Sequence, residues 1–331
     1  LINAMGGNGS QTSDSYYLFI GRTEAWEDDE NPPTPEDSVY QENDARFNML
    51  SLKLITSPKV SHVIPRYNWT SGQTYSEYDD QDELLTTKRY FVYTEDDLSV
   101  YKCIKAGSGP SVVRPSGIST SIGDVESDGY QWKYMFTLSG SDIGTFTTST
   151  FIPVDTLVTD DTTYQWDVQQ AAIDGGIHVI KVTDGGSNYT NNDVVVSIVG
   201  DGQYANAYAV LNTTSNTVQS IVVDNLGYGY RYAQISLLSS VGAGATAKAL
   251  ISPPGGHGSD PLCELGGSYL MFDIQLKNTE DGVLTTHNDY RQIALIEDPL
   301  LYGTSNLCST PVVSQLTTLN LNGTSVEYSE D

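Results

Sequence analysis

The stretch Ile177-His178-Val179-Ile180-Lys181-Val182-Thr183-Asp184-Gly185-Gly186-Ser187-Asn188-Tyr189 decides the fold of the middle of this chain, because its pattern returns 41 residues later. Apolar residues that alternate with polar ones are typical of a β-strand with one buried face. The pattern predicts a strand and a Gly-Tyr turn in each copy. The second copy places equivalent residues at Val218, Ile221, Val223, Gly227 and Tyr230.

Each copy continues with a second strand and then with a third strand of small residues. Alternate alanines in the third strand suit the close approach of another sheet layer, because larger side chains would clash there. The third strands are offset by 40 residues, so one residue is missing from a loop. We predict a two-copy repeat at 177–211 and 218–251. Arrays generally need about three repeats to bury their own faces, so these copies should pack on each other or on the host domain.

Short alternating runs separated by Gly, Asn, Asp and Ser clusters dominate the rest of the chain. They predict strands at 16–20, 89–94, 132–138 and 290–296. One helix is predicted from Val39 to about Leu52, because start signals precede a run of apolar residues near helical spacing. The fold class is therefore mainly β, a β-rich α+β protein with a two-domain layered β-sandwich architecture.

Composition limits the partners of this 331-residue chain, which is long enough for two domains. Sixteen basic residues against 42 acidic ones give a net charge of -26. Nucleic-acid affinity depends on Lys and Arg displacing counterions, and anionic membranes attract basic segments. We therefore expect neither nucleic acid nor a membrane as a partner. No stretch approaches the roughly 20 apolar residues that cross a bilayer.

The three cysteines are far apart in sequence, so they predict neither a disulfide framework nor a CxxC metal site. Isolated cysteines of this kind are usually small buried hydrophobes in a protein that folds in a reducing compartment. They are Cys103, Cys263 and Cys308.

Adjacent carboxylates occur at 79–80, 82–83 and 160–161. Paired acids about 5 to 9.5 Å apart can hydrolyse glycosidic bonds. In a chain with so many acids, adjacent pairs arise by chance, and such runs are mostly solvated faces. We interpret them as surface charge.

The segment Asp124-Val125-Glu126-Ser127-Asp128-Gly129 resembles the beginning of a calcium loop. The bidentate Glu expected six residues after the Gly is absent, since that position is Met135. An acidic turn that leads into the strand at Trp132 is the better interpretation.

No histidine has the spacing of a zinc ligand relative to another His or Cys. The Gly and Pro residues around His257 favour a connector, at 253–261, whose imidazole bonds a backbone carbonyl. Nucleophile elbows, phosphate loops and HExxH helices are also absent from the sequence. We predict no catalytic, cofactor-binding or metal-binding residues and no cofactor. The histidines are His62, His178, His257 and His287.

Two blocks near the beginning each combine a chain-turning Gly or Pro with an Arg and a Trp, a pattern typical of a rigid corner on which a guanidinium can stack. They are Ile20 to Trp26, followed by a Pro-rich stretch at 32–39, and Val63 to Trp69. Further blocks follow in order at Val100 to Cys103, Asp128 to Phe136, Phe151 to Val154 and Tyr290 to Leu300. The ordered set resembles the baseplate wedge subunit of contractile-tailed, T-even-type bacteriophages. The likeness fades between Asp155 and Gly267.

The resemblance implies a dimeric, non-enzymatic structural protein in which a second domain is inserted in a loop of the first. It places residues 1–90 plus 266–331 in a discontinuous first domain. Residues 91–265 then form the inserted β domain, which contains the repeat. The texture of the sequence agrees, because the family-like blocks at 20–69 and 290–300 flank a segment of different character.

We therefore expect a structural subunit of a phage tail baseplate wedge, a virion protein that is in the host cytoplasm during assembly. Its partners are expected to be a second copy of itself and other baseplate wedge proteins. The 22 tyrosines suit surfaces that become buried on assembly, or they reflect β-propensity alone. The alternatives are a carbohydrate-binding or adhesin-like β module and a polysaccharide-degrading enzyme. The strand pattern at 316–328 also predicts that the native chain continues beyond Asp331.

Overall fold

The computed structural model describes residues 14–190, 194–275, 289–300 and 304–309, together with the backbone of strands at 312–314, 316–321 and 324–329. Within this part of the chain, strands greatly outnumber helices and pair in antiparallel sheets, which confirms the mainly β fold. Tertiary contacts divide the chain into unit 1, residues 1–61 and 270–331, and unit 2, residues 62–269. Strand β3 (Val60–Pro65) and strand β14 (Tyr269–Phe272) carry the chain across the two boundaries.

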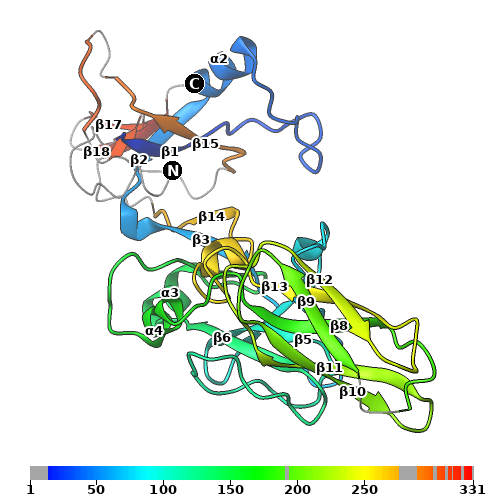
Figure 1. Ribbon diagram of the computed structural model, residues 1–331. Helices are drawn as coiled ribbons and strands as arrows, with labels where there is room; N and C mark the ends of the chain where they lie inside the picture. The colour runs from blue at the N-terminus through cyan, green and yellow to red at the C-terminus, as the bar shows by residue number, and fades with distance from the viewer. Residues whose placement is uncertain are drawn as a thin grey trace. The chain divides into compact units, whose positions relative to one another are not determined.

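Unit 1 is built on a four-stranded sheet in the order β15-β1-β2-β16. Strands β1, β2 and β15 are labelled in Figure 1. Tyr17 and Phe19 on β1 are buried with Leu52 and Cys308, and the Tyr17 hydroxyl donates to the Cys308 carbonyl at 3.0 Å. The guanidinium of Arg22 lies 3.6 Å from the ring centroid of Trp26, so the first predicted corner forms. The strands are β1 (Tyr16–Gly21), β2 (Met49–Leu54), β15 (Gln292–Glu297) and β16 (Val312–Ser314), with a separate hairpin of β17 (Leu316–Leu321) and β18 (Thr324–Ser329).

The predicted helix is shorter than the sequence pattern suggested. Helix α2 (Val39–Phe47) begins after Ser38, whose hydroxyl accepts from Gln41 N, and it ends at the capping residue Asn48. Leu50 and Leu52 lie on β2 instead, because that segment pairs with β1 and buries Leu52. Sheet pairing therefore overrides the helical spacing of these leucines.

The observed boundary between the units lies near residue 61, not near residue 90. Tyr75, Tyr78 and Tyr90 are all buried in the cores of unit 2, which holds the segment 62–90 within that unit. The second corner also differs from the expected pairing. Arg66 lies over the ring of Tyr93 at 5.2 Å from its centroid, and the indole Nε1 of Trp69 donates to the Ser111 hydroxyl at 3.2 Å.

The first layer of unit 2 is a three-stranded sheet, β4-β5-β6, that is buried on both faces. Phe91, Val100 and Met135 lie in one core, and Tyr101 and Trp132 lie in the other. The strands are β4 (Phe91–Thr94), β5 (Ser99–Lys105) and β6 (Gln131–Thr137). Strand β7 (Phe151–Pro153) pairs with β3, and helices α3 (Gly140–Phe146), α4 (Tyr164–Gln170) and α5 (Pro261–Glu264) and the turns η1 (Ser57–Lys59) and η2 (Leu85–Thr87) complete the described elements.

The repeat forms one six-stranded sheet that curls into a nearly closed barrel, drawn in green to yellow in Figure 1. The first strand of each copy pairs with the third strand of the other copy, and the two second strands pair in the middle. The copies therefore pack on each other. In the order β11-β10-β9-β12-β13-β8, the strands are β8 (Ile177–Asp184), β9 (Val195–Gly200), β10 (Asn206–Asn212), β11 (Thr217–Asn225), β12 (Ala233–Leu238) and β13 (Thr246–Ile251).

The strand registers of the two copies match residue by residue. The third strand of each copy, β10 or β13, pairs with the first strand of the other copy, β11 or β8. In both pairs the same alternate positions are matched, and the register shifts once near each end. The alanines of β10 and β13 point into the barrel, where Ala207 and Ala249 are buried, so the small side chains fill a barrel interior. The matched pairs are Ala207 with Val223, Ala209 with Ile221, Leu211 with Val218, Ala247 with Val182, Ala249 with Ile180, and Ile251 with Ile177.

A tyrosine from each copy packs on a glycine of the other. Tyr189 is buried against Gly242, and Tyr230 is buried against Gly202. A Cβ atom on either glycine would lie within 2.4 Å of two ring atoms. These two reciprocal contacts explain why Tyr189 and Gly202 recur as Tyr230 and Gly242 in the second copy.

Candidate functional site

Two lysines are buried in the three-stranded sheet of unit 2. Lys102 on β5 and Lys133 on β6 are direct cross-strand neighbours, and both are at least 98 % buried. Burial lowers the pKa of Lys102, against the opposing effect of Glu264. Burial also lowers the pKa of Lys133 to about 8, again opposed by Glu264 and reinforced by Lys102. Two adjacent buried amines require a strong internal anion.

Glu264 on α5 supplies that anion. Its Oε2 lies 2.7 Å from Lys102 Nζ, and its Oε1 accepts from the backbone N–H groups of Gly258 and Asp260. Lys102 Nζ also lies 3.9 Å from the ring centroid of Tyr78. The pair therefore fixes α5 and the connector before it against the sheet, and we call these residues, with Lys133, the buried cluster.

Two histidines adjoin the buried cluster. The ring of His257 meets Tyr78 at a centroid distance of 4.9 Å and His178 at 5.1 Å. His257 is buried and its Nδ1 has no hydrogen-bond partner, so the predicted bond to a backbone carbonyl is wrong for that atom. Burial, reinforced by the nearby lysines, lowers the pKa of His178 to about 4 and that of His257 well below its ordinary value. Both imidazoles are neutral at pH 7.

Acidification from pH 7 to pH 5 should lower the free energy of unfolding. The unfolded chain binds protons on these imidazoles near pH 6.5, whereas the folded chain resists them until about pH 4 in the case of His178. Stability is therefore full above pH 6.5 and is lost as the pH falls, by about 2 kcal/mol at pH 5 for His178 and in the same direction for His257. Urea denaturation of the parent and of His257→Gln at pH 7, 6 and 5 measures the slope. Equal slopes in both proteins would contradict this assignment.

A cavity of about 630 Å³ lies beside His178, over the seam where the barrel does not close. Strands β8 and β11 meet there, and a single backbone hydrogen bond joins them at each end, from Ile177 to Leu226 and from Val218 to Gly185. Within the described chain, no backbone hydrogen bond joins the two strands between these points. The opposite wall comes from the segments after β5 and before β6.

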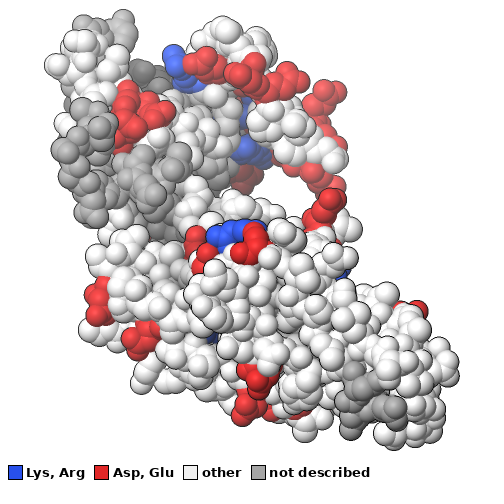
Figure 2. All heavy atoms as spheres, viewed as in Figure 1, with Lys and Arg blue, Asp and Glu red and all other residues white. Residues whose placement is uncertain are grey.

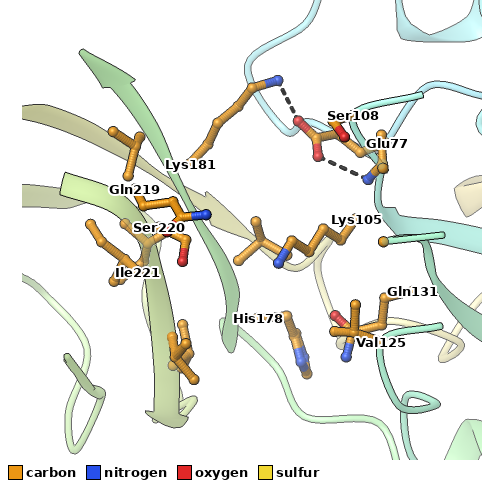
Figure 3. Close-up of a pocket in the computed structure, with 18 residues that line it drawn as sticks. Glu77, Lys105, Ser108, Val125, Gln131, His178, Lys181, Gln219, Ser220 and Ile221 are labelled. Atoms are coloured by element: carbon orange, nitrogen blue, oxygen red, sulfur yellow. Dashed lines mark hydrogen bonds and ion pairs between the residues drawn. The ribbon is translucent and has the colours of Figure 1, made fainter. Parts of the chain in front are cut away.

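The cavity is lined by polar side chains with few internal partners (Figure 3). Lys181 at its rim pairs with Glu77, which also accepts from Ala106 N at 3.1 Å. Figure 3 shows Lys105 extended between β11 and the segment that carries Val125 and Gln131. Among the described residues, no hydrogen bond or ion pair engages the side chains of Lys105, Ser108, Gln219 or Ser220.

The outer surface of the barrel carries a row of exposed apolar side chains. Leu238, Val195, Tyr208 and Val222 lie side by side on four adjacent strands, β12, β9, β10 and β11. Their exposed fractions run from 39 % to 59 %. We call this row the barrel face. Tyr204, Tyr228 and Tyr232 are also exposed, in the segments between the strands of the same barrel.

The two halves of the barrel are related by the sequence repeat, but only one half is covered by other described segments of the chain. The equivalents of Tyr208 and Val222 in the other half of the barrel are Lys248 and Lys181. Those lysines pair with Asp79 and Glu77, and Leu250 and Val179 beside them pack on Ile104 of β5. One half of the barrel is thus covered by its own chain. The equivalent surface of the other half is exposed.

The barrel face is also poor in charge for so acidic a protein. Between residues 194 and 251 the chain contains only Asp201, Asp224, Arg231 and Lys248 as charged residues. Figure 2 shows this part of unit 2 largely free of acidic side chains in that view. Repulsion between acidic chains is therefore weakest here.

The acidic pairs are used in local structure. Asp79 binds Lys248, Asp80 accepts from Ile251 N at 3.0 Å, and Asp82 pairs with Lys88. Asp160 and Asp161 accept from backbone N–H groups two residues ahead. These contacts stabilise turns and packing and bring no two carboxylates together around the cavity.

The calcium-like segment is a turn. Asp128 Oδ2 accepts from the backbone N–H groups of Val112 and Val113 and from the Ser111 hydroxyl. Burial alone would raise the pKa of Asp128, but these donors lower it below its ordinary value. No group of three or more potential metal ligands occurs in the part of the chain that the structure describes.

The remaining candidates are dispersed. His62 lies apart on β3, and His287 lies outside the described residues. Cys103 and Cys308 are buried, but Cys263 is exposed, contrary to the prediction for all three. Within the described residues, no helix is both long and apolar enough to cross a membrane.

Lys102 and Lys133 were not among the predicted site residues, although both stand inside the apolar runs at 100–103 and 132–138. A lysine flanked on both sides by apolar residues in a strand buried on both faces was the available signal. The cavity had no such signal, because its lining comes from five separated segments. In comparisons with known proteins, no family model and no curated protein matches the chain.

Proposed function

We propose that this chain is a non-enzymatic structural subunit of a phage tail baseplate wedge, which assembles through protein-protein contacts. The barrel face is the observation that carries the proposal. Exposed apolar side chains side by side on a rigid sheet, without charge, are typical of a surface that another protein covers. The resemblance of the ordered sequence blocks supplies the name of the assembly.

The family-like blocks support a structural role in another way. Almost every block, or the strand that adjoins it, contributes a fully buried residue to a core. These residues are Tyr17, Ile64, Val100, Met135 and Ile152. Several polar groups of these blocks engage the same chain, as Lys102 engages Glu264.

The expected assembly is a homodimer that also binds other wedge proteins, and light scattering with Tyr208→Asp tests the surface. The parent should have twice the chain mass in moderate salt. The variant should be at least tenfold weaker in self-association or in binding to the other wedge proteins of the same phage, because a charge in an apolar interface loses its water without gaining a partner. Val158→Asp is the matched control, since Val158 is 84 % exposed elsewhere in unit 2.

Two outcomes would contradict the proposal. A parent protein that stays monomeric at high concentration would contradict the proposed homodimer. A folded Tyr208→Asp variant that assembles like the parent would contradict the proposal that the barrel face is an interface. Interfaces of stable dimers bury more than about 1,000 Å², so a single row can be only the centre of the contact.

A carbohydrate-binding module is the second candidate, favoured by the exposed ring pair of Tyr204 and Tyr228, whose centroids lie 5.7 Å apart. Such a module binds glycans without other proteins. Glycan binding that is lost in Tyr228→Ala, with normal monomer mass, would favour it over the wedge subunit.

A further inference from the structure

The cavity over the barrel seam is a second surface that the assembly role does not use. It is recessed between β8, β11 and the segments around Lys105 and Gln131, and its volume is in the range of small-molecule sites. It lies in a different place from the barrel face, although Val222 borders both. Its polar groups therefore call for a separate explanation.

The charge of the cavity favours an anion. Lys181 is neutralised by Glu77, which leaves Lys105 as the cation without a partner among the described lining residues. One free ammonium matches the single charge of a carboxylate, because the Lys181–Glu77 pair at the rim is neutral overall and leaves no second cation in the described lining for a doubly charged phosphate. The neutral imidazole of His178 adds no charge.

The hydrogen-bonding groups favour hydroxyls on that anion. Ser108 and Ser220 can each donate and accept, and the Gln219 amide offers both kinds of group. A sugar hydroxyl also donates and accepts, so it satisfies such side chains in any order. Val125 and Val179 supply apolar area for the C–H groups of a ring.

We propose that this cavity binds an acidic sugar, whose carboxylate pairs with the Lys105 ammonium and whose hydroxyls bond to Ser108, Gln219 and Ser220. The edges of β8 and β11, which are not joined along the middle of the seam, form the floor of the site. This proposal is independent of the wedge function, since a structural subunit can carry a glycan site.

Isothermal titration of the full chain with glucuronate tests the proposal, with glucose, acetate and inorganic phosphate as comparison ligands. Glucuronate should bind at least tenfold more tightly than any of the three. Lys105→Met should weaken glucuronate binding at least tenfold, and Gln219→Ala should weaken it less. Lys88→Met is the matched control, because Lys88 already pairs with Asp82 away from the cavity.

Each outcome decides. Equal affinity for acetate and glucuronate would show that the sugar hydroxyls do not contribute to binding. Equal or higher affinity for phosphate would show that the cavity binds anions without selecting a sugar. Either result overturns the acidic sugar, as does unchanged binding in a folded Lys105→Met variant or no binding by the parent at millimolar glucuronate. Thermal melting of each variant checks folding, and light scattering on the same samples shows that assembly is unaffected.

Discussion

Glu264→Ala should lower the free energy of unfolding by about 3 to 5 kcal/mol, because it leaves the buried ammonium of Lys102 without its anion. Lys102 is fully buried, and Glu264 Oε2 is 2.7 Å away. The substitution also removes the acceptor of two backbone N–H groups, those of Gly258 and Asp260. Urea denaturation at pH 7 measures the loss.

A rescue variant distinguishes the charge from the packing. Lys102→Met combined with Glu264→Gln removes both charges and keeps an amide oxygen for Gly258 and Asp260, so it should be clearly more stable than Glu264→Ala. Glu42→Ala is the control for an exposed pair, since its partner Arg46 is also exposed, and it should cost less than about 1 kcal/mol. A loss from Glu264→Ala that is no larger than that of Glu42→Ala would show that the buried pair is not a stabilising clamp.

Gly242→Ala should destabilise the barrel by about 3 kcal/mol. The added Cβ would lie 2.2 Å from Cδ1 and 2.4 Å from Cγ of Tyr189. Because Cγ is the first ring atom and is bonded directly to Cβ, rotation of the ring cannot move it aside within the packed interior. Gly202→Ala should have a similar effect through Tyr230, because the contacts are equivalent.

A double variant tests whether the tyrosine ring is the cause. Gly242→Ala in a Tyr189→Ala background should cost little more than Tyr189→Ala alone, which gives a large interaction energy in the cycle. Gly109→Ala is the matched control, because no atom lies within 4 Å of its added Cβ. Additive losses in the cycle would contradict the reciprocal Gly-Tyr packing.

Much of the fold followed from local patterns. The sequence runs gave β1, β4, β6 and β15 to within a few residues. In β1 and β15 buried and more exposed residues alternate, because a strand with one buried face leaves a period of two in the sequence. Strands β4 and β6 are buried on both faces and show as short apolar runs instead. The end of α2 could not be predicted from the local sequence. Leu50 and Leu52 fit a helix and a strand equally well, and only pairing with β1 places them on a strand. Pairing between distant segments decided that boundary.

The sequence by itself determined that the chain is mainly β, that its middle is duplicated, and that its net charge is -26. Each of these is a property of local order or of composition, which tertiary contacts cannot change. Only the tertiary structure decided that the first strand of each copy pairs with the third strand of the other, so that the two copies form one barrel. Such pairing depends on segments that are far apart in sequence. The tertiary structure also brought Lys102 to Glu264 across 162 residues and placed Lys105 over the seam, because such contacts leave no trace in sequence spacing.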